Sequence, residues 1–93
     1  MGRLDWRSLQ ALRGRTLKTK RGREFHIPRL LEGAVVVAPH KRQARRVSQR
    51  CLEKAVAKIE EGVVIKGPSD YRKEICDESP SYAWGILKEL EYV

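Results

Sequence analysis

The chain has 93 residues and a formal net charge of +8, and 41% of its residues are hydrophobic, 34% charged and 6% aromatic. This length fits one small domain with a thin core, and the lack of an apolar run of about 20 residues excludes a transmembrane helix. The first residues lack the apolar stretch of a signal peptide. We therefore expect an intracellular protein, cytoplasmic or associated with the nucleoid, that makes no membrane contact.

The charge divides the chain into two halves. Residues 1–50 hold 14 of the 20 Lys and Arg residues and 3 of the 12 Asp and Glu residues, whereas residues 51–93 hold 6 and 9. A positive field this concentrated attracts polyanions such as nucleic acids. We expect a single domain, 1–93, with a basic α/β half at about 1–50 and a more acidic helical half at about 51–93.

The first predicted element is a helix over residues 6–13. Asp5 is placed to cap its free amide groups, and Leu4 and Leu9 have the spacing of a hydrophobic staple. Gly14 provides a stop at its other end.

Short strands follow this helix. Residues 16–18 favour a strand, and Gly22 favours a turn at 20–23 because glycine tolerates a positive φ. Residues 24–27 alternate polar and apolar side chains, which predicts a half-buried strand. Pro28 cannot donate to a ladder, so it should end this strand or place it at the edge of the sheet.

The strongest strand signal is the β-branched run at 34–38, which should be central in the sheet. A turn at 39–42 then leads to a fourth strand at 43–47. Sequential strands joined by short turns favour an antiparallel meander.

The second half of the chain favours helices. Ser48 is placed as the N-cap of a helix that ends at Gly62, with an apolar stripe along one side. Residues 63–65 form a connector or a short strand.

Two shorter helices complete the prediction. Ser69 is placed to cap a brief helix at 70–75, and Ser79 followed by Pro80 is typical of a helix start, here of a helix at 80–90. The predicted fold class is therefore α+β, with an N-terminal helix, a three- to four-stranded antiparallel meander and C-terminal helices packed against it.

The two cysteines, Cys51 and Cys76, do not form a disulfide framework. For an intracellular chain we favour reduced thiols, with a Cys51–Cys76 bridge as the minority alternative. The histidines and cysteines lack the paired spacings of a zinc site, and there is no phosphate-cradling glycine loop or dinucleotide fingerprint. We expect no metal, no cofactor, no catalytic residues and no enzymatic activity.

The first basic cluster spans the end of the first helix, the first strand and the turn after it. It resembles the wing of a nucleic-acid-binding domain, because the planar fork of arginine binds a phosphate through two hydrogen bonds. The alternative is a solvated edge that blocks aggregation. The cluster consists of Arg13, Arg15, Lys18, Lys20, Arg21 and Arg23.

The second basic cluster leads into the N-terminus of the second helix. Cations there oppose the helix dipole, and that local conflict indicates a functional demand; Ser48 would either cap the helix or donate to a phosphate. In an antiparallel meander the turns at 20–23 and 39–42 fall at the same end of the sheet, so the two clusters should form one surface. This cluster consists of Lys41, Arg42, Arg45, Arg46 and Arg50.

The last two helices resemble a helix-turn-helix, whose second helix enters the major groove. Ser81, Tyr82 and Trp84 would lie near the start of that helix, as base-reading residues or as contacts to a partner. The acidic residues around them oppose phosphate binding, so this helix pair could equally bind a partner protein or form a homodimer.

The sequence therefore predicts a non-enzymatic nucleic-acid-binding module that contacts backbone phosphates, with duplex DNA favoured over RNA, acting as a small regulator or accessory subunit. Two alternatives stay open: an adaptor or small regulatory subunit that docks an acidic protein, and an RNA- or ribosome-associated protein. The low aromatic content argues against a single-strand stacking surface.

Overall fold

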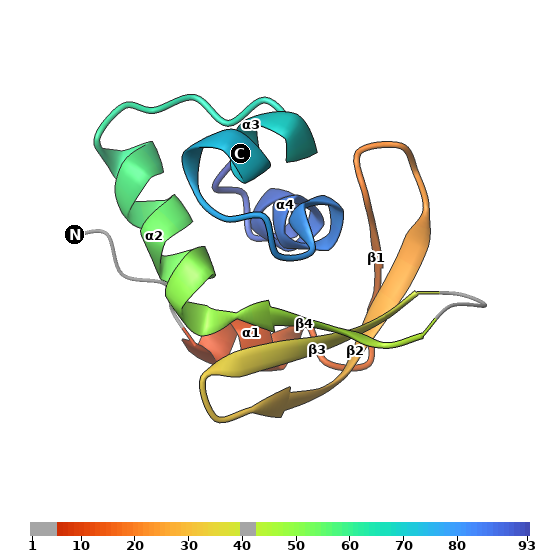
Figure 1. Ribbon diagram of the computed structural model, residues 1–93. Helices are drawn as coiled ribbons and strands as arrows, with labels where there is room; N and C mark the ends of the chain where they lie inside the picture. The colour runs from red at the N-terminus through yellow and green to blue at the C-terminus, as the bar shows by residue number, and fades with distance from the viewer. Residues whose placement is uncertain (1–5, 40–42) are drawn as a thin grey trace.

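The computed structural model describes residues 6–39 and 43–93. It confirms the predicted α+β class, with an N-terminal helix, an antiparallel sheet and C-terminal helices (Figure 1). The expected Asp5 cap, the Leu4–Leu9 staple and the turn residues 40–42 lie outside the described residues. The elements are α1 (Trp6–Ala11), β1 (Thr16–Lys18), β2 (Glu24–Leu31), β3 (Ala34–Pro39), β4 (Arg45–Ser48), α2 (Gln49–Glu60), α3 (Pro68–Glu74) and α4 (Pro80–Glu89).

The four strands form a meander in the order β1-β2-β3-β4, with every neighbouring pair antiparallel. Leu17 lies opposite Phe25, and Val35 lies opposite Val47. All four side chains are buried, because residues paired across a sheet point to the same face. That face carries the core, and β3 is internal as its sequence predicts.

Strand β2 does not end at Pro28, contrary to the expectation from the sequence, and it does not lie at an edge. It runs on to Leu31 between β1 and β3. The register shifts between His26 and Arg29, where three steps along β2 match two along β3. This irregularity accommodates a proline inside an internal strand, since a bulged residue needs no ladder hydrogen bond.

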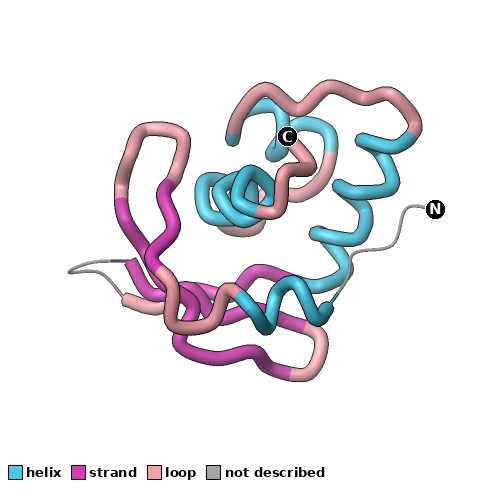
Figure 2. Tube along the Cα trace, turned by 180° about the vertical axis from the view of Figure 1, so that it is seen from behind, coloured by secondary structure: helices cyan, strands magenta, loops and turns pink. Residues whose placement is uncertain are grey.

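The β1–β2 hairpin rises from the rest of the sheet and lies alongside α4 (Figures 1 and 2). We call residues 16–27 the arm. A Cβ atom built on Gly85 of α4 would lie 2.8 Å from the carbonyl oxygen of Lys18 and 3.0 Å from Cε1 of Phe25. Glycine at this position therefore permits the close approach of the arm to the helix.

Helix α4 occupies the centre of the molecule, between the arm on one side and α2 on the other in both views (Figures 1 and 2). Its residues 83–87 are all buried. Because five consecutive residues of a helix point in every direction around its axis, the middle of α4 is enclosed on all sides.

The helix boundaries follow the sequence at α2 and α4 to within one or two residues, whereas α1 ends at Ala11 instead of at residue 13 and α3 starts earlier than predicted. Ser48 precedes α2, as predicted, whereas α3 begins at Pro68 after the N-cap Gly67 rather than after Ser69. Proline at the first helical position has a suitable φ and lacks an N–H that would be unpaired there in any case. Residues 63–65 form a connector without a strand.

In the part of the chain that the structure describes, none of the helices has the length and apolar character needed to cross a bilayer.

Candidate nucleic-acid interface

A groove of about 1090 Å³ separates the tip of the arm from α3 and the start of α4. We call it the basic groove. Strand β4 and the linker between α2 and α3 also contribute to its walls. Its cationic lining residues are Lys20, Arg21, Arg23, Arg45, Lys66 and Arg72.

The tip of the arm is fixed by hydrogen bonds centred on Thr19. The amide of Thr19 donates to the carbonyl oxygen of Arg23 at 2.9 Å, and the amide of Gly22 donates to the carbonyl oxygen of Thr19 at 2.9 Å. The amide of Arg23 donates to Thr19 Oγ1 at 3.2 Å, and Gly22 adopts a φ of 86° that suits glycine. The backbone that carries Arg21 and Arg23 is therefore held in one conformation.

Lys20 closes the arm onto the α2–α3 linker. Its Nζ donates to the carbonyl oxygen of Lys66 at 2.9 Å and lies 6.0 Å from the ring centroid of Trp84, within cation–π range. A Cβ atom on Gly67 would come within 2.9 Å of Lys20 Cδ and Nζ. The hairpin that the sequence likens to a wing is thus fastened to the rest of the domain at its tip.

Two carboxylates line the basic groove, and both are already occupied. Asp77 forms an ion pair with Arg72, with its Oδ1 3.1 Å from Arg72 Nε, and Asp70 accepts a hydrogen bond from the backbone amide of Lys66 at 2.9 Å. Within the described residues the side chains of the remaining cations make no ion pair and no hydrogen bond. These four free cations are Arg21, Arg23, Arg45 and Lys66.

Strand β4 divides the second basic cluster between two faces. Arg45 pairs with Val37 and lines the basic groove, whereas Arg46 pairs with Val36 and points to the opposite face of the sheet. Arg50 is exposed on the first turn of α2 and does not line the groove. Lys41 and Arg42 lie outside the described residues.

The first cluster is also distributed. Lys20, Arg21 and Arg23 line the basic groove, and Arg13 is exposed in the turn after α1. Arg15 donates to Glu89 Oε1 of α4 at 2.9 Å, which compensates its charge.

A second hollow, of about 840 Å³, adjoins the basic groove and shares Arg23 and Tyr82 with it. Lys18 and His26, exposed on β1 and β2, line this hollow. Glu24 lines the same hollow and offsets the charge of Lys18, so this hollow adds no net positive charge beyond the shared Arg23.

The three candidate base-reading residues of α4 are placed differently. Ser81 is exposed and Tyr82 half-buried, and both line the basic groove; the Tyr82 ring meets the edge of Phe25 at a centroid distance of 5.2 Å. Trp84 is buried, and its Nε1–H donates to the carbonyl oxygen of Ile65 at 3.1 Å. A helix enclosed like α4 cannot enter a major groove with its length, so the helix-turn-helix interpretation does not fit this fold.

Sequence reasoning missed Lys66 and Arg72, which belong to the acidic half of the chain. Nothing local distinguishes them, because they join the basic groove only when the arm folds over the α2–α3 linker. The separation of Arg45 from Arg46 did have a sequence signal: the two-residue period of a strand that places Val47 in the core assigns the two arginines to opposite faces.

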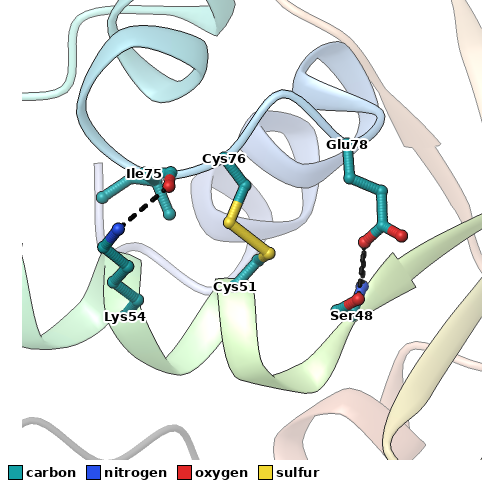
Figure 3. The surroundings of a disulfide bond; sticks show 6 residues. All are labelled: Ser48, Cys51, Lys54, Ile75, Cys76 and Glu78. Carbon is teal, nitrogen blue, oxygen red and sulfur yellow. Dashed lines mark hydrogen bonds between the residues drawn. A yellow bond between two sulfur atoms is a disulfide. The ribbon is translucent and has the colours of Figure 1, made fainter.

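Figure 3 shows how the segment before α4 is tied to α2. Cys51 of α2 and Cys76 form a disulfide with their Cα atoms 6.1 Å apart, so the expectation of two reduced thiols is wrong. Lys54 Nζ donates to the carbonyl oxygen of Ile75 at 3.1 Å.

The N-terminus of α2 is occupied by a carboxylate from the same segment. Oε1 of Glu78 accepts from the backbone amide of Ser48 at 2.8 Å and from its hydroxyl at 2.6 Å. This anion offsets part of the unfavourable interaction between the nearby arginines and the helix dipole. It also engages the Ser48 hydroxyl, which the sequence had offered as a phosphate donor.

Tyr71 of α3 is fully buried, and its hydroxyl has no hydrogen-bond partner among the described residues. Burial, and secondarily the negative charge of Glu78, raise the pKa of Tyr71 above its ordinary value. The phenol is therefore neutral and belongs to the core that supports the groove.

Comparisons with known proteins find no counterpart for this chain: no family model, no curated protein and no solved structure matches it.

Proposed function

We propose that this protein is a non-enzymatic nucleic-acid-binding module that holds duplex DNA by its backbone phosphates, as a small regulator or accessory subunit inside the cell. The observation that carries the proposal is the convergence on the basic groove of four cations that have no partner among residues 6–39 and 43–93. They come from three separate segments, with Arg21 and Arg23 on the arm, Arg45 on β4 and Lys66 on the α2–α3 linker.

The chemistry of this set favours phosphate. Guanidinium groups bind phosphate oxygens through two parallel hydrogen bonds, and an ammonium adds a point charge. Asp77 is paired with Arg72, whereas Asp70 keeps its negative charge because its hydrogen-bond donor is a neutral backbone amide. Six cationic side chains against two carboxylates still leave the lining of the groove net positive.

Duplex backbone contact is favoured over single-strand stacking. Among the described residues that line the basic groove, Tyr82 is the only aromatic one, and its ring already packs against Phe25. Proteins that bind single strands without sequence preference commonly stack successive bases on several aromatic side chains.

A matched pair of charge reversals tests the proposal. Arg45→Glu and Arg46→Glu make the same change of charge at neighbouring positions on opposite faces of β4. We expect Arg45→Glu to weaken binding of fluorescent duplex DNA and to lower the slope of log K against log salt by about 0.9, the loss of one phosphate contact. Arg46→Glu should leave the slope unchanged.

The same fluorescence-anisotropy titration is run with matched duplex RNA and single strands. Tighter binding of duplex RNA would replace DNA with RNA as the ligand. No binding of any of these nucleic acids at low salt, or equal effects of the two reversals, would overturn the basic groove as a nucleic-acid site and leave an acidic protein as the partner that explains the charge.

A further inference from the structure

We propose that the Cys51–Cys76 disulfide regulates the basic groove: the oxidised protein holds one wall of the groove in place, and reduction by a dithiol releases that wall and weakens binding. This inference rests on the proposed function, because its readout is the affinity of the same groove.

Three ties join α2 to residues 75–78 (Figure 3). They are the Cys51–Cys76 disulfide, the hydrogen bond from Lys54 to the Ile75 carbonyl, and the bonds from Ser48 to Glu78. Only the first is covalent. The others join groups that are exposed or partly exposed, where water competes for the same donors and acceptors.

The wall of the basic groove that we mean here is formed by residues 77–82, and it begins directly after Cys76. Asp77, Ser79 and Tyr82 all line it, and Asp77 also holds Arg72 at 3.1 Å. The position of Cys76 therefore sets where this wall stands relative to the arm.

The same segment contains a strained residue. Ser79 has φ 45° and ψ 52°, a left-handed conformation that costs energy for any residue with a Cβ atom. Such a conformation persists only while its surroundings impose it. Once the covalent tie is gone, relaxation of Ser79 favours movement of the start of α4 away from its position in the groove.

The redox step is an ordinary thiol–disulfide exchange. A thiolate of the dithiol attacks one sulfur of the Cys51–Cys76 bond and forms a mixed disulfide, and the second thiol of the reductant then displaces the remaining protein sulfur. The protein gains two electrons and two protons as two thiols, and the dithiol is oxidised to its disulfide. Both cysteines are half-buried rather than enclosed, so the attack has access.

The reduced protein should bind more weakly because a smaller fraction of its molecules keeps the groove in the conformation that binds DNA. If about one reduced molecule in ten keeps the wall in place, the apparent Kd rises about tenfold, since it scales inversely with that fraction. The free cations of the arm, β4 and the linker remain, so binding is weakened rather than lost.

The test measures anisotropy of labelled duplex DNA with the oxidised protein, with the protein reduced by dithiothreitol, and with the Cys51→Ser/Cys76→Ser double variant. We expect the reduced protein and the variant to bind about tenfold more weakly than the oxidised protein, and the variant to ignore the reductant. Amide hydrogen exchange should accelerate in residues 75–82 of the reduced protein, while circular dichroism shows that the domain stays folded.

The experiment distinguishes failure of the proposed redox regulation from failure of the proposed function. Equal affinity of the oxidised and reduced proteins, or unchanged exchange in residues 75–82, would overturn the regulation and leave the proposed function standing. Absence of DNA binding in both redox states would overturn the proposed function itself, and the regulation of that function with it.

Discussion

Substituting Gly85 with alanine tests how the arm is seated on α4. The added methyl group would lie 2.8 Å from the Lys18 carbonyl oxygen and 3.0 and 3.2 Å from two ring carbons of Phe25. Neither neighbour can yield easily, because one is strand backbone and the other is a buried ring packed against Tyr82. We therefore expect the arm to be displaced from the helix.

Two opposing effects determine how much Gly85→Ala changes the free energy of unfolding. Replacing glycine by alanine inside a helix stabilises it by about 1 kcal/mol, whereas overpacking a filled site costs about 1–3 kcal/mol. With two contacts at or below 3.0 Å we place Gly85→Ala near the upper end of that cost, for a net loss of ~1–2 kcal/mol. For a domain of this size the loss corresponds to a fall in Tm of about 5–15 °C.

Thermal unfolding followed by circular dichroism measures this change. The matched control is Ala57→Gly in the interior of α2, which isolates helix propensity and should cost about 1 kcal/mol. DNA binding by folded Gly85→Ala should also weaken, because Arg21 and Arg23 move with the arm. A variant as stable as the wild type or more stable would refute the packing of the arm described above.

Two further predictions concern the interior and the disulfide. Tyr71→Phe should stabilise the protein by ~1 kcal/mol or more, because it removes a buried hydroxyl that has no hydrogen-bond partner in the described part of the chain; a loss of stability would show that the hydroxyl is hydrogen-bonded after all. Folding raises the pKa of Tyr71, because the buried phenol resists ionisation. The free energy of unfolding of the wild type should therefore fall as the pH rises beyond about 10, the ordinary pKa of tyrosine, where only the unfolded chain loses this proton. Urea titrations between about pH 8 and 11 should show a smaller fall in the free energy of unfolding for Tyr71→Phe than for the wild type. The Cys51→Ser/Cys76→Ser variant should lose ~3.5 kcal/mol, the loop-closure value for a separation of 25 residues, and an unchanged urea midpoint would argue against the bond.

The sheet and α2 were predictable because the sequence patterns that indicate them involve residues close together in the chain. Alternation identifies inward-facing residues such as Phe25 and Val47, and a stripe of apolar side chains after Ser48 identifies the buried side of α2. The bulge at Pro28 was not predictable, since a proline alone does not show whether the neighbouring strand shifts its register.

The basic groove was only partly predictable because it depends on contacts between distant segments. The cations of the arm and of β4 belong to a basic run, but Lys20 is used in a hydrogen bond to a residue 46 positions away. That contact brings in Lys66 from an acidic region. The Cys51–Cys76 bond likewise depends on how α3 turns back towards α2, which neither cysteine's surroundings reveal.

The central position of α4 also determines how the chain acquires its structure. The arm and α3 both pack against this helix, and the Phe25 ring meets Tyr82. A chain lacking residues 80–89 would leave the apolar sides of both the arm and α3 facing water. The domain should therefore fold in a single cooperative step that requires α4, the last helix of the chain. Its many long-range contacts should make that step slower than the folding of a helical bundle of the same length.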